Sequence, residues 1–305
     1  SDWFFQMVFC ATTCSIVSGT LAERIKIWPF FIFCALLTGF IYPIQGYWNW
    51  GGGFLSSGGY SDYAGSGTVH LCGAAAALAI VTVLGPRKGK YNSDGSVNAM
   101  PGSNIPIAAL GAWILWLGWF GFNGGSELVV SSEASAIAVS QVFLNTNMAA
   151  AGGVVAALLT SLFATGKMDV TMAMNGAIAG LVAITAEPLT PSMGQAVIIG
   201  AIGGIICMYG MKLLDMLKID DVVGAIPAHL FAGIWGTLAV PLTNADASFS
   251  AQLIGVLSIN IFVFAVSYIV WSIMKGTFGI RLSKEAETKG TDVTETGVIA
   301  YAIRD

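Results

Sequence analysis

The sequence contains only two histidines, His70 and His229, and each lies within a run of apolar residues. Burying an ionisable side chain at membrane depth is costly, so such a residue indicates a functional site and a partner. Because lysines and arginines lie outside the apolar runs or at their very ends, we expect the two imidazoles to be partners of each other. The alternative is that they are unrelated and hydrogen-bond to backbone carbonyls.

A pair of imidazoles along an apolar passage suits one kind of substrate. A low dielectric disfavours the charged ring, and a neutral imidazole donates and accepts hydrogen bonds without trapping an ion. Potassium and ammonium are similar in size, but only ammonium can lose a proton and cross as a neutral molecule. The two histidines therefore predict a dry pore that passes ammonia and excludes metal ions because desolvating them is costly.

Aromatic and hydroxyl side chains near the ends of the apolar runs could bind the substrate before it enters. Trp50 precedes three glycines, and the face of its ring could hold a cation, while Ser126 could hydrogen-bond at the same mouth. Phe5 and Phe9 lie four residues apart on one helical face, and Phe122 could add a further ring. The alternatives are an interfacial aromatic belt for the tryptophan and core packing for the phenylalanines.

The composition indicates that lipid is the solvent for most of the chain. Its 305 residues are 55% hydrophobic and 10% charged, with a mean hydropathy of +0.76, whereas soluble domains carry roughly a quarter charged residues. This excludes an ordinary soluble enzyme. The net charge of −4 and the lack of a basic stripe argue against a nucleic-acid partner. The five cysteines lack zinc-site spacing, so we expect buried thiols, no metal and no cofactor.

The apolar runs predict an all-α polytopic membrane protein. We expect nine spans, near 3–23, 27–47, 67–85, 105–123, 139–164, 172–186, 193–216, 225–243 and 250–277. Most reach the length of about 20 residues that crosses a bilayer, and none alternates with the period of two expected for a β-barrel. Because an apolar run is already under way at Trp3, we expect the chain to begin partway through a larger protein. Glycine pairs such as Gly176/Gly180 and Gly200/Gly204 favour close helix packing.

The charged residues orient these spans. All 13 lysines and arginines fall in connections on one side or in the C-terminal segment, which predicts an outer N-terminus and a cytoplasmic C-terminus. The opposite connections hold acids: Asp62, Glu127, Glu133, Glu187 and Asp246. This outer face either concentrates cations or merely mirrors the positive-inside bias. In this scheme the spans of His70 and His229 run in opposite directions, which hints at inverted repeats with a site at mid-membrane.

The ordered motifs of the chain resemble the Amt/Mep/Rh ammonium transporter family, and its bacterial-type Amt branch most closely. The resemblance covers essentially the whole chain. Its motifs include Ala22-Glu23-Arg24-Ile25, Trp50-Gly51-Gly52-Gly53, Asp62-Tyr63-Ala64-Gly65, Gly67-Thr68-Val69-His70, Gly118-Trp119-Phe120-Gly121-Phe122-Asn123, Asn145-Thr146-Asn147, Asp220-Asp221 and Gly279-Ile280-Arg281-Leu282-Ser283.

The resemblance implies a fold of eleven transmembrane helices in two inverted repeats, assembled as a homotrimer with one pore per subunit. About nine helices would be present here, without two N-terminal ones, in a transmembrane domain at 1–278 followed by a cytoplasmic tail at 279–305. It also implies residue roles. Trp50, Ser126 and Phe5 would recruit ammonium, Phe9 and Phe122 would form a phenyl gate, His70 and His229 would be the pore histidines, and Asp62 would give structural and electrostatic support.

The implied activity is uptake of ammonium, and of methylammonium as an analogue, across the cell membrane, without enzymatic chemistry. A PII-type signal protein would dock on the cytoplasmic face. The chain departs from the family pattern before the second histidine, where Gly224 replaces an aspartate, and in the tail, where Thr296 replaces a histidine. The alternatives are an ammonium sensor of the same fold, a gas channel of the Rh branch, and a membrane enzyme that uses the two histidines.

Overall fold

The computed structural model describes residues 1–301, so residues 302–305 of the predicted tail lie outside it. The described chain is helical and contains no strand. The longer helices are α1 (Asp2–Leu21), α2 (Ile27–Leu36), α3 (Tyr42–Asn49), α5 (Cys72–Leu84), α6 (Ile105–Trp119), α7 (Glu133–Thr165), α8 (Val170–Ile184), α9 (Met193–Met216), α10 (Ala232–Ala239) and α11 (Phe249–Thr277). The short helices are α4 (Phe54–Ser57) and α12 (Lys284–Lys289).

Several of these helices are interrupted or extended by π-helical turns. Such turns follow α2 at Leu37–Ile41, precede α5 at Ser66–Leu71, follow α6 at Phe120–Gly124 and precede α10 at Pro227–Phe231. A π-turn widens the backbone locally and is frequent at functional sites. Two of the four turns contain the histidines, and a third contains Phe122.

Seven helical segments within residues 1–301 are long and apolar enough to cross a membrane. The predicted runs at 172–186 and 225–243 coincide with the shorter apolar helices Val170–Ile184 and Pro227–Leu242. A multi-pass helical membrane protein is therefore confirmed, while the count of nine spans stays a prediction. Helices α6, α7, α8, α9 and α11 begin at polar caps, since the side chains of Asn104, Ser132, Asp169, Ser192 and Ser248 accept hydrogen bonds from their first turns.

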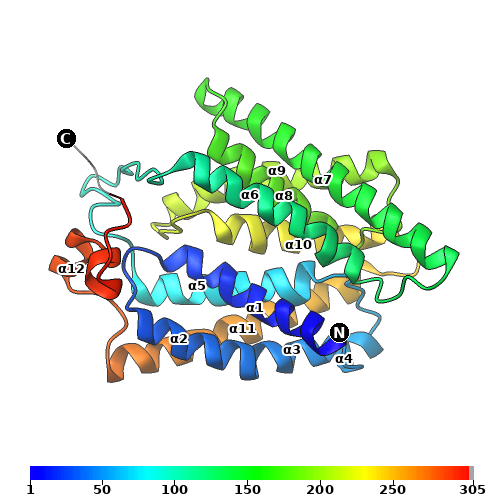
Figure 1. The fold of residues 1–305 in the computed structure, drawn as a ribbon, viewed down its shortest axis with the longest axis horizontal. Helices are drawn as coiled ribbons and strands as arrows, with labels where there is room; N and C mark the ends of the chain where they lie inside the picture. Colours follow the sequence, from blue (N-terminus) through cyan, green and yellow to red (C-terminus); the bar gives the residue numbers. More distant parts are fainter. Residues whose placement is uncertain (302–305) are drawn as a thin grey trace.

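The helices form two groups that face each other (Figure 1). One group contains α1, α2, α3, α5 and α11, and the other contains α6, α7, α8, α9 and α10. Most of α5 and the turn before it is buried, and Cys72, Ala74, Ala75, Ala76 and Ala77 are wholly inaccessible. These small side chains let α1 and α11 pack directly on α5. The turn that holds His70 therefore lies at the centre of the bundle.

Small residues also bring α7, α8 and α9 together, as the glycine spacing predicts. A Cβ added to Gly180 or Gly200 would lie 2.4 or 2.0 Å from the carbonyl oxygen of Ala149. A Cβ on Gly176 or Gly204 would in turn lie 2.5 Å from the carbonyl oxygen of Gly153. Both glycine pairs therefore pack against the same turn of α7, and no larger residue fits at these contacts.

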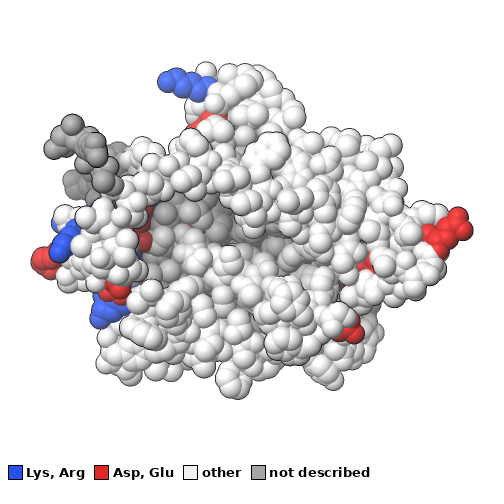
Figure 2. All heavy atoms as spheres, viewed as in Figure 1, with Lys and Arg blue, Asp and Glu red and all other residues white. Residues whose placement is uncertain are grey.

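Charged residues gather at the two ends of the molecule (Figure 2). Lysine and arginine colours appear around α12 and at the end of α7, whereas the far end, where α7 begins, shows acidic colours. The start of α1 and α12 lie at opposite ends (Figure 1). This separation accords with the predicted sidedness, and which end faces the cytoplasm stays a prediction.

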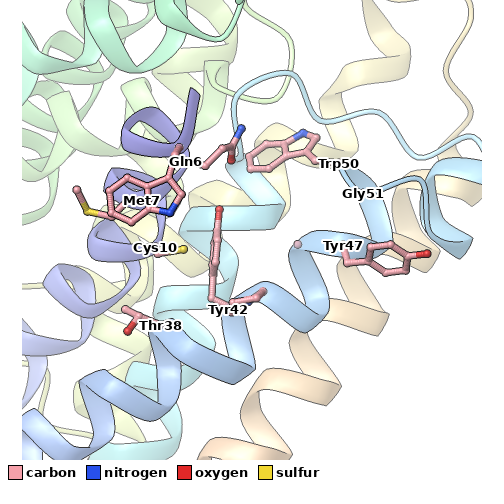
Figure 3. Close-up of a pocket in the computed structure, with 11 residues that line it drawn as sticks. Gln6, Met7, Cys10, Thr38, Tyr42, Tyr47, Trp50 and Gly51 are labelled. Carbon is pink, nitrogen blue, oxygen red and sulfur yellow. The ribbon is translucent and has the colours of Figure 1, made fainter. Parts of the chain in front are cut away.

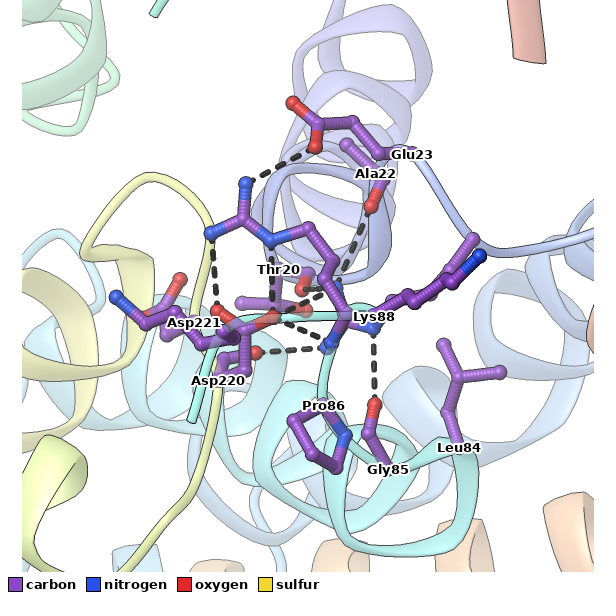
Figure 4. Close-up of polar contacts among 12 residues, drawn as sticks. Thr20, Ala22, Glu23, Leu84, Gly85, Pro86, Lys88, Asp220 and Asp221 are labelled. Atoms are coloured by element: carbon purple, nitrogen blue, oxygen red, sulfur yellow. Dashed lines mark hydrogen bonds and ion pairs between the residues drawn. The ribbon is translucent and has the colours of Figure 1, made fainter. Parts of the chain in front are cut away.

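At the α12 end, Asp220 joins three segments of the chain (Figure 4). Arg87 donates through Nε and Nη2 to the two carboxylate oxygens of Asp220, at 2.9 and 3.0 Å. Arg24 donates through Nη2 to the Asp220 carbonyl at 2.7 Å and through Nε to the Gly85 carbonyl at 2.9 Å. Burial would raise the pKa of Asp220, but its hydrogen bonds with Arg87 and the nearby guanidinium groups lower it overall.

The segment after α11 packs onto this same end. Arg281 donates to the carbonyls of Leu84 and Pro86, at 3.0 and 2.7 Å, and pairs with Glu287 of α12 at 2.9 Å. Glu295 accepts a hydrogen bond from the backbone amide of Ile27 at 2.8 Å. The first part of the predicted tail is therefore held against the loops that surround Asp220.

Candidate functional site

His70 and His229 are brought together across the two groups of helices. Their Nδ1 atoms lie 3.2 Å apart, and their rings are 5.2 Å apart and nearly parallel, at 22°. The expected partnership of the two imidazoles is thus observed. Within residues 1–301, the buried Nε2 atom of His70 has no hydrogen-bond partner, so it remains available to a molecule in the passage.

The turn that presents His70 is held by Asp62. This buried carboxylate accepts hydrogen bonds from the amides of Gly65, Gly67 and Thr68 at 3.0, 3.1 and 2.7 Å, and from the Thr68 hydroxyl at 2.8 Å. Burial raises the pKa of Asp62, and the hydrogen bonds to the carboxylate partly offset that rise. Gly65 has φ of 109°, a left-handed conformation that favours glycine.

The turn that presents His229 is built in the same way by Asp221. Its carboxylate accepts hydrogen bonds from the amides of Gly224 and Ile226 at 3.1 and 2.7 Å. Gly224 has φ of 78°, so the residue that departs from the family pattern occupies a position that favours glycine. Asp221 does for His229 what Asp62 does for His70.

The two turns also share a pattern in the sequence, which the predictions above did not include. Asp62, Gly65 and His70 form the pattern Asp-x-x-Gly-x-x-x-x-His, and Asp221, Gly224 and His229 repeat it. In each copy the aspartate accepts hydrogen bonds from amides of the turn, the glycine has a positive φ and the histidine lines the inner cavity described below. The repeat strengthens the hint of two related halves.

Aromatic rings continue from the histidines towards the end where α1 begins. Phe122 lies 5.2 Å from the His70 ring, and Phe9 lies 4.3 Å from Phe122 at a tilt of 57°. Trp50 and Phe5 then contact Phe9 edge-on, at 5.7 and 4.7 Å. The predicted rings therefore form one continuous series of contacts: His229, His70, Phe122 and Phe9, with Trp50 and Phe5 both against Phe9.

Trp119 is a further member of this cluster, and it was not among the residues predicted from the sequence. Its ring stacks on His70 at 5.0 Å and 16°, and its Nε1 donates to the Thr185 hydroxyl at 2.8 Å. It lies three residues before Phe122, so helical spacing placed it on the same face. Trp119 fixes one side of the His70 ring.

Two cavities lie on either side of the Phe9–Phe122 pair. The pocket nearer the start of α1, called the outer pocket after the predicted sidedness, has a volume of about 200 Å³. It is lined by Phe5, Gln6, Phe9, Trp50, Tyr63, Ser126 and Leu128. The inner cavity, of about 480 Å³, is lined mainly by apolar side chains and contains both histidines and Phe122. The face in Figure 2 is hollowed between the two groups of helices. The phenyl rings thus stand between a polar entrance and an apolar chamber.

The polar atoms of the outer pocket are partly committed already. The indole Nε1 of Trp50 donates to the Asp62 carbonyl at 2.9 Å, and the Ser126 hydroxyl donates to the Phe122 carbonyl at 2.9 Å. The ring of Trp50 and the hydroxyl of Ser126, which can still accept, both line the pocket and suit a cation that donates hydrogen bonds. A second depression, of about 690 Å³, lies between α1 and α3 and shares Gln6 and Trp50 with this pocket (Figure 3).

No group of three histidine, cysteine, aspartate or glutamate side chains within residues 1–301 is arranged to hold a metal ion. The five cysteines are free, and two of them, Cys72 and Cys207, are fully buried.

Comparisons with known proteins agree with this geometry. The family model described as Ammonium Transporter Family matches residues 1–301. The ammonium transporter Amt2 of Archaeoglobus fulgidus is 44% identical over 330 residues, which cover 98% of this chain and 69% of that protein.

Solved structures show the same fold. A chain described as a sensor Amt protein superposes with a TM-score of 0.92 at 36% identity, covering 96% of this chain and 76% of that one. Mep2 of Candida albicans gives a TM-score of 0.82 at 30% identity, covering 91% and 65%. The family model, which matches residues 1–301, spans both groups of helices and both histidine turns. The chain belongs to the ammonium transporter family.

Proposed function

We propose that this protein takes up ammonium across the cell membrane through a pore lined by His70 and His229. Ammonium binds in the outer pocket against Trp50, Ser126 and Phe5. It loses its proton near Phe9 and Phe122, and ammonia then crosses the apolar chamber past the two histidines. The released proton follows by way of the hydrogen-bonded imidazole pair and rejoins ammonia on the far side, so that each ammonium carries one net charge across the membrane. The observation that carries the proposal is the continuous line of rings from the outer pocket to the histidine pair.

The physical argument concerns charge. The outer pocket provides a π face and oxygen acceptors, which suit ammonium, whereas the inner cavity is mainly apolar. Neutral imidazoles can bind a neutral molecule in turn, by donating or accepting hydrogen bonds, without holding it as an ion. A metal cation cannot lose its charge by giving up a proton. It would have to enter the apolar cavity as an ion without its hydration water, which is costly.

The remaining expectations belong to the same proposal. Residues 1–278 act as the transmembrane domain and 279–305 as a cytoplasmic tail, the subunits assemble as a homotrimer, and methylammonium is a second substrate. A PII-type signal protein docks on the cytoplasmic face, near the basic loops. No enzymatic step is needed for this function.

The first prediction tests the pore. Replacing both His70 and His229 with leucine should abolish the ammonium-driven current of proteoliposomes on a solid-supported membrane, because the chamber then has no imidazole to hydrogen-bond ammonia or to carry the proton. Wild-type protein should respond to ammonium and methylammonium pulses and give no current with potassium. An unchanged elution volume on size exclusion would show that the variant still assembles, and an undiminished current in it would refute the pore assignment.

A sensor is the second candidate function, favoured by the likeness to a sensor Amt protein. A sensor would bind ammonium in the outer pocket without sustained transport. Saturable, ammonium-dependent thermal stabilisation in a wild type that carries no current would favour this alternative.

A further inference from the structure

Tyr63 and Glu127 form a polar pair at the edge of the outer pocket. Tyr63 lines the pocket beside Trp50 and Ser126, and its hydroxyl donates a hydrogen bond to the Glu127 carboxylate. Glu127 directly follows Ser126 in the sequence, and both members of the pair are half-buried. The pocket therefore has a carboxylate one hydrogen bond behind its lining.

Both residues sit on backbone that is held in place. The amides of Tyr63 and Ala64 donate to the carbonyls of Ala186 and Thr185 at 2.8 and 3.0 Å, which fixes this loop against the end of α8. The amides of Ser126 and Glu127 donate back into the π-helical turn Phe120–Gly124, at 3.2 and 3.3 Å. Such support keeps the pair in one geometry before any ligand arrives.

The chemistry of the pair suits a cation that donates hydrogen bonds. A phenol that donates to a carboxylate keeps its own lone pairs as acceptors, and the negative partner makes that oxygen a stronger acceptor. The hydroxyl of Ser126 can also accept a hydrogen bond, because it donates its own proton to the Phe122 carbonyl and keeps its lone pairs. Besides the amide oxygen of Gln6, the pocket thus offers two hydroxyl acceptors, Tyr63 Oη and Ser126 Oγ, and the ring of Trp50.

The other carboxylate near Tyr63 is already engaged. Glu187 is buried and accepts hydrogen bonds from the Asn244 side chain at 2.7 Å and from the Thr190 amide at 3.3 Å. Asp62 is likewise committed to the turn that holds His70. Glu127 is the carboxylate in this part of the described chain that bonds directly to a pocket-lining side chain.

We propose that Tyr63 and Glu127 complete the outer cation site and set its affinity for ammonium. Tyr63 accepts a hydrogen bond from the ammonium ion, and Glu127 positions the phenol and supplies the compensating negative charge. This inference rests on the proposed function, in which the outer pocket receives ammonium.

The test separates affinity from turnover. In Glu127→Gln the half-saturating ammonium concentration should rise about three- to tenfold, because a unit charge near the site is lost, while the maximal current stays close to wild type. Tyr63→Phe should raise it by a similar factor, and the double variant should be no worse than the poorer single one, since the two act as a unit. Glu127→Asp, which keeps the charge, should recover part of the affinity.

Two controls distinguish a charge effect from a structural one. Glu133→Gln removes a charge from the exposed start of α7, on the same face of the molecule, and should leave the half-saturating concentration unchanged. Raising the ionic strength should weaken wild-type affinity and shrink its difference from Glu127→Gln, because mobile ions screen the carboxylate. An unchanged half-saturating concentration in both single variants, or a loss of maximal current alone, would overturn the inference.

Failure of the inference remains distinct from failure of the proposed function. If wild-type protein carries no ammonium current, the transport proposal fails, and binding is then measured as ammonium-dependent thermal stabilisation in detergent. A larger shift for wild type than for Glu127→Gln supports the outer site, and equal shifts refute it.

Discussion

At the scale of single residues, the turn of each of the two histidines depends on an aspartate and a glycine that precede it at fixed spacing. Asp62 and Asp221 accept the amide hydrogens that would otherwise be unpaired at the start of the two turns. Gly65 and Gly224 adopt the positive φ that lets the backbone enter each of the two turns. The positions of the two imidazoles thus depend on residues that do not line the inner cavity.

A prediction follows for the two aspartates. Asp62→Ala should lower the free energy of unfolding by about 2–4 kcal/mol, because several buried amides lose their acceptor, and Asp62→Asn should cost less since one acceptor oxygen remains. Asp221→Ala should behave like Asp62→Ala. Thermal unfolding of detergent-solubilised protein measures the effect, with Asp246→Ala, on an exposed loop, as the control. Equal stability of the two alanine variants and the control would contradict this role for the aspartates.

At the scale of elements, the π-helical turns and the glycine contacts determine where the functional side chains lie. The run from Ser66 to Leu84 changes from a π-turn to the α-helix α5 at Cys72, and the run from Pro227 changes in the same way at Ala232. The wider turn alters the direction of the side chains within it relative to a regular helix. The apolar runs in the sequence predict the helices but not these local changes of pitch.

The packing of α7 on α9 gives the next prediction. Gly200→Ala should lower the thermal unfolding midpoint and reduce transport, because the added Cβ would lie 2.0 Å from a backbone carbonyl that cannot move aside. Gly194→Ala on the same helix adds a Cβ where nothing lies within 4 Å, so it should be neutral or slightly stabilising. If both variants unfold at the same temperature as wild type, close packing at Gly200 does not limit stability.

At the scale of the whole molecule, ion pairs at the α12 end tie together segments that are far apart in the sequence. Arg24 follows α1, Arg87 follows α5 and Asp220 precedes the turn of His229, and all three side chains are buried. Burial lowers the pKa of Arg24 to about 10, with Asp220 offsetting part of the effect, so the guanidinium stays charged at neutral pH. The network is therefore ionic under ordinary conditions.

This network predicts a dependence of stability on pH. Because the pKa of Asp220 is lower in the folded protein than the ordinary value of about 3.9, its stabilisation is present above that value and is lost as the pH falls through the folded pKa. Asp220→Asn should cost about 3–5 kcal/mol at neutral pH, since the buried Arg24 loses its counter-charge and Arg87 keeps only the exposed Glu23 as an ion-pair partner. The difference in thermal midpoint between wild type and variant should narrow on acidification, and a constant difference down to the acid limit would refute the assignment.

The sequence alone was enough to predict that lipid surrounds most of the chain and where its apolar helices lie. It also predicted that the two histidines are partners of each other. These follow from local properties, since composition, run length and the cost of burying an imidazole can be read residue by residue. The roles of Phe5, Phe9, Phe122, Trp50 and Ser126 rested on family resemblance, because an aromatic ring in an apolar run packs equally well in a core.

The tertiary structure alone decided which partners meet across long separations in the chain. The bonds from Asp221 to the His229 turn, from Tyr63 to Glu127, and from Arg87 to Asp220 depend on how the two groups of helices face each other. Polar contacts of this kind are short-range and directional, so spacing along the chain does not reveal them. Hydrophobic periodicity places a helix in the membrane, but only packing sets its rotation and depth to within a hydrogen bond.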